Sequence, residues 1–215
     1  MLKGYANDLT DEAVREHTLK LWRQVKREFV EDLVCWLTDE SDYFTAPCST
    51  KFHLAVPGGL ARHSLNVLGL LTMKAADLQL DEKYRESIIV CALGHDLCKT
   101  GFYKRVTRRE VAPFNPKDQC DLPIRVTEAW EVDDQLPLGH GEKSLFLLQQ
   151  FIPVTDEEAL AIRWHMTAFD ASVHFPYPNG HAYNAAVKKT PLVTLLFTAD
   201  FEASQIIEAE EEDRP

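Results

Sequence analysis

Apolar residues follow a helical period along most of the chain. They recur at steps of three and four residues in six stretches, at about 10–38, 60–78, 81–97, 141–151, 156–166 and 191–208. Residues that favour helix starts stand at four of these stretches, namely Thr10 or Asp11, Asp81, the capping-box pair Thr155 and Glu158, and Pro191. The pattern therefore predicts a mostly α fold, with an N-terminal helix at 10–38.

Three segments lack this period. Residues 43–60 include Pro47, Pro57, Gly58 and Gly59 and are predicted as an irregular loop, and residues 168–189, with two prolines and Asn179-Gly180, are also predicted as loop. Between 102 and 132, β-branched residues alternate with charges, which indicates a small β-hairpin or a long loop. With no repeat or linker, we expect residues 1–215 to form a single domain that ends in a solvated acidic tail at 208–215.

The composition argues against several classes of protein. The chain has 215 residues, 45% of them apolar, which is enough for a sizeable core. Its net charge of −11 argues against a protein that holds long nucleic acid by neutralising phosphates. The five cysteines include no Cys-x-x-Cys pair, and no apolar run approaches the roughly 18 residues of a membrane span. We therefore expect a soluble, cytoplasmic protein without a membrane partner.

His95 and Asp96 stand side by side at the end of the apolar run 88–93. Helical spacing also directs His63, His165 and Asp200 inward, because each shares a face with apolar residues three, four or seven positions away. His140 follows Gly139 at a helix start, and its direction is less defined. A single inward histidine is more often a hydrogen-bonded core residue, and an inward aspartate often pairs with arginine. Six such groups together favour a metal site.

The order of these residues resembles the HD superfamily of metal-dependent phosphohydrolases. That family has a His on one helix, an adjacent His-Asp at the end of a later helix, and a final Asp on a C-terminal helix. The flanking sequences Gly58-Gly59-Leu60-x-x-His63 and His95-Asp96-Leu97-Cys98-Lys99 are also similar to its motifs, with Cys98 where many members have Gly. The resemblance covers about residues 52–204, and it implies an HD-domain helical bundle.

The resemblance implies a ligand set. His63, His95, Asp96 and Asp200 would bind one metal ion, and Asp96 would bridge to a second ion held by His140 and His165. Mixed imidazole and carboxylate ligands suit Mn, Fe, Co, Ni or Zn, without selecting one of them. One or two divalent transition-metal ions are therefore expected.

Candidate substrate-binding residues adjoin these ligands. Lys99, three residues after Asp96, is expected to bind a phosphate oxygen, although a surface lysine is the alternative. Arg62 and Lys143 lie near His63 and His140 in sequence, and related phosphodiesterases often carry a histidine near the position of His53. The basic residues Lys104, Arg105, Arg108 and Arg109 either attract a polyanion or form a solvated hairpin face.

Two functions remain open at this point. The first is a phosphohydrolase or phosphodiesterase in which a metal-activated water attacks a small phosphorylated substrate, either a nucleotide or a short oligonucleotide. Asp96 and Lys99 would then be the catalytic residues. The second is an HD-fold module that binds a nucleotide or a partner without turnover. The six inward ligands favour the enzyme.

Overall fold

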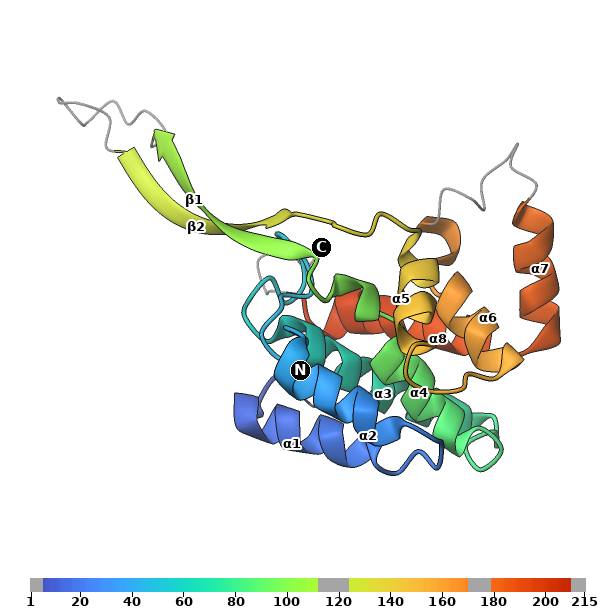
Figure 1. The fold of residues 1–215 in the computed structure, drawn as a ribbon. Helices are drawn as coiled ribbons and strands as arrows, with labels where there is room; N and C mark the ends of the chain where they lie inside the picture. The colour runs from blue at the N-terminus through green and yellow to red at the C-terminus, as the bar shows by residue number, and fades with distance from the viewer. Residues whose placement is uncertain (1–5, 112–123, 170–178, 210–215) are drawn as a thin grey trace.

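The protein is mostly helical, with a two-stranded antiparallel sheet, as the sequence pattern predicts (Figure 1). The computed structural model describes residues 6–111, 124–169 and 179–209. The helical elements are α1 (Asp11–Trp22), α2 (Val30–Cys35), η1 (Trp36–Glu40), α3 (Gly59–Asp77), α4 (Arg85–Gly94), η2 (Leu97–Lys99), α5 (His140–Leu148), α6 (Asp156–Trp164), η3 (Thr167–Phe169), α7 (Asn179–Lys189), α8 (Leu192–Glu202) and η5 (Ala203–Ile207). The strands are β1 (Tyr103–Val111) and β2 (Ile124–Val132).

The predicted single helix at 10–38 is wrong, because the chain turns between α1 and α2. Thr10 does cap α1, where its Oγ1 accepts a hydrogen bond from the Ala13 N–H at 3.2 Å. The helix ends at Trp22, and Phe29 adopts a left-handed conformation with φ 63° before α2 begins. Five of the six residues between Trp22 and Phe29 are polar. The turn therefore lets two short helices each bury their apolar face.

Two helix starts can be compared with the prediction. Asp81 does not cap α4, which starts at Arg85 after a turn that buries Tyr84. The capping box of Thr155 and Glu158, in contrast, is confirmed at the start of α6.

The predicted loop at 168–189 contains helix α7, while residues 170–178 lie outside the described residues. Tyr183, Ala186 and Val187 recur at helical spacing and pack against Trp164 and Val193. This apolar stripe explains the helix. Pro176 and Pro178 before the helix and Gly180 in its first turn hide this pattern in the sequence.

The core forms where α3, α4, α6 and α8 pack together. Helix α3 lies against α4 and α8, α6 lies against α5 and α8, and α1 covers α3 and α4. Fully buried leucines and isoleucines fill the centre, including Leu65, Leu71, Leu93, Leu196 and Ile162. Among the described residues, no helix is long and apolar enough to cross a membrane.

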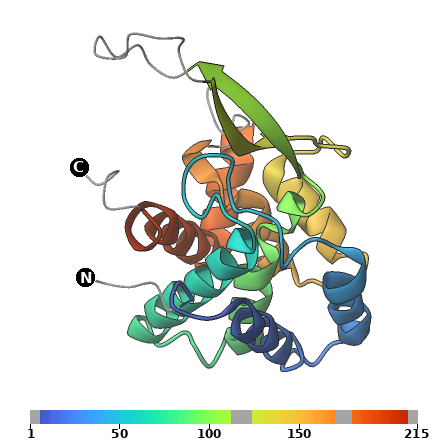
Figure 2. The same cartoon turned by 90° about the vertical axis from the view of Figure 1, so that its left-hand side faces the viewer.

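The hairpin leaves this helical body. Its strands pair in antiparallel register from Tyr103 opposite Val132 to Val111 opposite Ile124. Both views show the two strands extending away from the helices (Figures 1 and 2). The predicted hairpin at 102–132 is therefore confirmed, and most of its surface faces solvent.

A buried ion pair ties the turn after α1 to α6. The two terminal nitrogens of Arg27 each donate to a carboxylate oxygen of Glu158 at 2.6 Å, and the Glu158 side chain is buried. We expect Arg27→Met to lower the free energy of unfolding by about 3–5 kcal/mol, because it leaves a buried carboxylate without its partner. Chemical denaturation measures this loss. The exposed pair of Arg23 and Glu31 offers a control, since Arg23→Met should cost less than about 1 kcal/mol.

The same pair predicts a pH dependence. Burial alone would raise the pKa of Glu158, but the hydrogen bonds from Arg27 and neighbouring groups lower it below its ordinary value. Glu158 therefore stays ionised to lower pH in the folded protein than in the unfolded chain. Its contribution is fully present above the pKa of the unfolded chain and is lost as the pH falls through the folded pKa. The difference in Tm between wild type and Arg27→Met should shrink at acidic pH, and an unchanged difference would exclude this account.

Candidate metal centre

The six predicted ligands meet at one place in the helical bundle. They come from the body of α3 (His63), the residues after α4 (His95 and Asp96), the start of α5 (His140), the residue after α6 (His165) and α8 (Asp200). Four sets have donor atoms within 4.8 Å of one another, and three of them contain two or more predicted ligands: His63, His95 and Asp200; His95, Asp96 and His165; and Asp96, Cys98 and His140. This buried cluster of His, Asp and Cys side chains can hold a metal ion.

Close backbone contacts bring these elements together. A Cβ on Gly141 would lie 2.6 Å from the Ile162 carbonyl oxygen and closer still to that of Arg163, so α5 approaches α6 more closely than a larger residue allows. The contact places the rings of His140 and His165 5.4 Å apart. Gly59 similarly lies against the backbone of the 48–54 loop, where an added Cβ would be 3.0 Å from the Cys48 nitrogen. Helix α3 can therefore start beside that loop.

Asp96 lies between two groups of histidines. Its Oδ1 is 2.8 Å from His140 Nε2 and 3.7 Å from His165 Nε2. Its Oδ2 is 3.6 Å from His63 Nε2 and 3.5 Å from His95 Nε2. Each carboxylate oxygen thus faces a different pair of imidazoles.

Asp200 adds a second carboxylate to the group around Oδ2. Its Oδ1 is 3.1 Å from His63 Nε2 and 3.9 Å from His95 Nε2. The two Nε2 atoms of these histidines are themselves only 3.3 Å apart. Two imidazoles and two carboxylates therefore converge on one small volume, which is the arrangement that a divalent transition metal stabilises.

The orientation of the imidazoles fits a metal. The Nδ1 of His95 lies 2.9 Å from the Ala92 carbonyl oxygen, and that of His165 lies 2.7 Å from the Ile162 carbonyl oxygen. Because a carbonyl only accepts, each Nδ1 carries the proton and each Nε2 presents a lone pair. The buried Nε2 of His165 has no hydrogen-bond partner in the part of the chain that the structure describes. A cation would satisfy these lone pairs.

The pKa shifts of His95 and Asp96 match the protonation states of metal ligands. Burial lowers the pKa of His95 to about 4, so this imidazole is neutral near pH 7. Burial would raise the pKa of Asp96, but the positive charge of Lys99 and the hydrogen bond with His140 hold it well below its ordinary value. Both residues therefore have the neutral imidazole and ionised carboxylate forms that bind metals. Burial would lower the pKa of His63, but the negative charges of Cys48 and Glu208 raise it well above its ordinary value, so this imidazole must lose a proton when a metal binds.

Glu208 belongs to this site, and the prediction of a solvated tail is wrong at this position. Helix α8 continues through η5, which carries the Glu208 carboxylate back to α3. There its two oxygens lie 3.1 and 2.9 Å from His63 Nδ1, and Asn66 Nδ2 donates to it at 2.9 Å. The carboxylate thus fixes the Nδ1 proton of His63 and leaves Nε2 for a metal. The eight-residue step from Asp200 signals a shared helix face, but the acidic run around Glu208 obscures it.

We expect Glu208→Gln to weaken metal binding by about 10–100-fold, as is usual when the carboxylate behind a ligating histidine is lost. Titration of the metal-free protein with Co²⁺ or Mn²⁺ measures the change. Glu202→Gln is the matched control, because Glu202 lies on the same helix but pairs with Lys74 at the surface. Equal affinities in the two variants would show that Glu208 does not orient His63.

Two further residues on the 42–57 loop approach the cluster. The donor atoms of Cys48, His53 and His63 lie within 4.8 Å of one another, and the buried His53 Nε2 has no hydrogen-bond partner among the described residues. Burial would raise the pKa of the Cys48 thiol, but the charges of His63 and Lys99 lower it to about 7. Sequence reasoning misses Cys48, because loop positions carry no periodic signal. His53, the predicted substrate-binding residue, therefore lies beside the ligand His63.

Lys99 is buried beside Asp96. Its Nζ lies 2.6 Å from Asp96 Oδ2 and 3.3 Å from Cys48 Sγ. The alternative of a surface lysine is therefore wrong. A buried ammonium at this position offsets the charge of the carboxylate and stands within the cluster.

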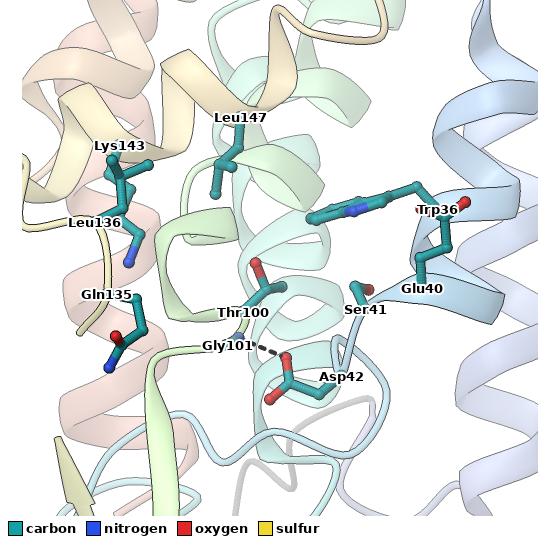
Figure 3. Close-up of a pocket in the computed structure, with 10 residues that line it drawn as sticks. All are labelled: Trp36, Glu40, Ser41, Asp42, Thr100, Gly101, Gln135, Leu136, Lys143 and Leu147. Atoms are coloured by element: carbon teal, nitrogen blue, oxygen red, sulfur yellow. Dashed lines mark hydrogen bonds between the residues drawn. The ribbon is translucent and has the colours of Figure 1, made fainter. Parts of the chain in front are cut away.

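Arg62 and Lys143 lie apart from the cluster, each with other partners. The Arg62 guanidinium donates to the carbonyl oxygens of Ala6 and Leu9 and pairs with Asp11. Arg62 points away from the cluster although it precedes His63, because successive residues on a helix point about 100° apart. Lys143 pairs with Asp134 and lines a cavity of about 450 Å³ (Figure 3). Its neighbours there include Trp36 from η1 and Thr100 from the turn after η2. None of the six metal-ligand candidates lines this cavity.

No protein-family model matches the chain, and no curated protein or solved structure matches it. Function must therefore be inferred from the residues of the cluster. Their arrangement is compatible with an HD-type metal site.

Proposed function

We propose that this protein is a metal-dependent phosphohydrolase of the HD superfamily, acting on a nucleotide or a short oligonucleotide. The observation that carries the proposal is the position of Asp96, whose two oxygens face two separate pairs of histidines. A buried ion pair needs only one cationic partner for its carboxylate, whereas four imidazoles surround Asp96.

The residues divide into two ligand sets. His63, His95, Asp200 and Asp96 Oδ2 would hold one divalent ion, and His140, His165 and Asp96 Oδ1 would hold a second. Mn, Fe, Co, Ni and Zn all accept such ligands. When bound, divalent metals activate water as a nucleophile and neutralise charge on a phosphoryl group.

The chain's own residues supply positioning. His140 and Asp200 have side chains 31% and 19% exposed, whereas the other four ligands are almost fully buried, so substrate reaches the cluster from their side. Lys99 Nζ can bind a phosphate oxygen while it stays within reach of Asp96. The apolar residues behind His95, such as Leu93 and Leu97, keep water from the other side.

One observation favours a second candidate, a nucleotide-binding module without turnover. The Lys99 ammonium already lies 2.6 Å from Asp96, so it compensates this carboxylate without a metal. A chain that relies on this ion pair would bind an anionic ligand at Lys99 without hydrolysing it. Hydrolysis of a phosphoester therefore separates the two candidates.

The test combines metal analysis with a substrate panel. Purified protein should contain a transition metal and, with Mn²⁺ supplied, hydrolyse at least one member of a panel of phosphate monoesters, diesters and cyclic phosphodiesters. Protein that binds metal but leaves the whole panel intact would favour the binding module. Protein that binds no metal under any of these conditions would contradict the proposed enzyme.

A further inference from the structure

The two faces of the hairpin differ in chemistry. Strand alternation and the observed register place one set of side chains on each face. We call the first set the ribbon face, which consists of Tyr103, Arg105, Thr107, Arg109, Val126, Glu128, Trp130 and Val132. The opposite face carries Lys104, Val106, Arg108, Thr127, Ala129 and Glu131.

The cations of the two faces have different partners. On the opposite face, Lys104 pairs with Asp133 at 3.4 Å and Arg108 pairs with Glu131 at 3.1 Å. On the ribbon face, the Arg105 guanidinium lies 5.5 Å from the centre of the Trp130 ring. Neither Arg105 nor Arg109 has a carboxylate partner among the side chains that the structure describes. The ribbon face therefore presents two arginines that have no ion-pair partner among the described side chains, together with one acid, Glu128, whose carboxylate accepts a hydrogen bond from Thr107 at 2.9 Å.

A chain of contacts links the inner end of the ribbon face to the metal cluster. Tyr103, at its inner end, donates a hydrogen bond to the Cys48 carbonyl oxygen at 3.3 Å. Cys48 Sγ is 3.3 Å from Lys99 Nζ, which contacts Asp96. From Tyr103 to Arg109 the strand extends for about 20 Å, at roughly 3.4 Å per residue. A chain bound along this face would have one end at the cluster.

Aromatic, apolar and arginine side chains alternate along this face. Val126 and Val132 are 60% and 55% exposed, and Trp130 is partly exposed beneath Arg105. Bases stack on aromatic and guanidinium planes, while arginines neutralise phosphates, which is how proteins bind single-stranded nucleic acid without reading its sequence. A small mononucleotide would not reach these residues from the cluster.

We propose that the ribbon face binds a single-stranded oligonucleotide substrate and directs its end toward the metal cluster. The assignment of this ligand as a substrate rests on the proposed function, whereas binding itself does not. Two arginines can neutralise only a few phosphates. Binding of a short strand on this face is therefore compatible with the net charge of −11, which argues only against binding of long nucleic acid. With a slope of about −0.7 per phosphate for single strands, two phosphate contacts predict a salt dependence of log K against log[salt] of about −1.4.

The test measures binding to the full chain in EDTA, which suppresses turnover. Fluorescence anisotropy with a labelled thymidine 12-mer and a labelled dinucleotide should show tighter binding of the 12-mer. Trp130→Leu should weaken 12-mer binding about 5- to 160-fold, the range for loss of one stacked base. The double variant Arg105→Gln/Arg109→Gln should also weaken it and bring the salt slope close to zero.

The matched control is Lys104→Gln/Arg108→Gln, which removes the same charge from the opposite face and should bind the 12-mer like wild type. Equal binding by the two double variants would overturn the proposal, as would equal affinity of wild type for the 12-mer and the dinucleotide. A ribbon-face variant that converts a dimer to a monomer in sedimentation, with no oligonucleotide bound by wild type, would assign the face to a second copy instead.

A separate readout distinguishes this proposal from the proposed function. Bis(p-nitrophenyl) phosphate is small enough to need only the metal cluster, so the ribbon-face variants should hydrolyse it like wild type. If they do, but 12-mer binding is unaffected, the ribbon proposal fails and the hydrolase stands. If the 12-mer depends on the ribbon face but no ester is hydrolysed, the ribbon proposal stands and the hydrolase fails.

Discussion

Asp96→Asn should remove metal binding and phosphoester hydrolysis together. Asparagine keeps the shape of the side chain but loses its charge and one of the two oxygens that face the histidine pairs. Both proposed ions lose a ligand through this one change. Loss of metal assistance costs several kcal/mol of transition-state stabilisation, so we expect hydrolysis to fall on the order of 10³-fold. Elemental analysis and steady-state kinetics on the same preparation measure both effects.

In Asp96→Asn, the buried ammonium of Lys99 loses its carboxylate partner, which lowers the stability of the fold. The double variant Asp96→Asn/Lys99→Met removes both charges and should restore folding if the single variant is unstable. Asp156→Asn is the control, since this aspartate is exposed at the start of α6 and pairs only weakly with Lys189. Unchanged metal content and unchanged hydrolysis in a folded Asp96→Asn protein would show that the proposed site is wrong.

Gly141→Ala should disrupt the second ligand set more than the first. The added methyl group would lie 2.6 Å from the Ile162 carbonyl oxygen, which is backbone and can move only with α6. That same carbonyl accepts the hydrogen bond from His165 Nδ1. Separating α5 from α6 therefore moves His140 and His165 apart and turns the His165 ring. We expect a stability loss of about 1–3 kcal/mol or more, as for overpacked cores.

The measurements are thermal denaturation and metal stoichiometry. Gly141→Ala should melt at a lower temperature and retain at most the ion held by His63, His95 and Asp200. Gly69→Ala is a suitable control, because an added Cβ there meets nothing within 4 Å and alanine favours the helix. If Gly141→Ala matches wild type in Tm and in metal content, the contact between α5 and α6 does not organise the second set.

Helical periodicity predicts much of the fold and the ligands themselves. His63 and Asp200 share helix faces with core residues, so the packing that buries those faces also brings the two side chains together. Helical periodicity does not predict features that depend on contacts between residues far apart in the sequence. The break before α2 depends on the left-handed Phe29, and α7 depends on contacts with Trp164, so neither has a strong local signal.

The position of a residue in the sequence, next to a ligand or in a polar run, also does not show whether its side chain reaches the cluster. Arg62 follows Ala61 and precedes His63, yet its guanidinium binds the segment before α1. Glu208 lies in an acidic run that resembles a solvated tail, but η5 returns it to His63. Cys48 comes from a loop, where only the folded chain shows its distance to Lys99. The sequence signal of a residue that orients a ligand is therefore weaker than that of the ligand itself: the helical spacing of Glu208 is obscured by the acidic run around it.

Anomalous diffraction from crystals grown with Mn²⁺ tests the central claim most directly. The account predicts a strong peak among His63 Nε2, His95 Nε2, Asp96 Oδ2 and Asp200 Oδ1, and a second ion, if present, between Asp96 Oδ1, His140 and His165. Peaks that occur only at surface carboxylates, with Lys99 still paired to Asp96, would contradict it.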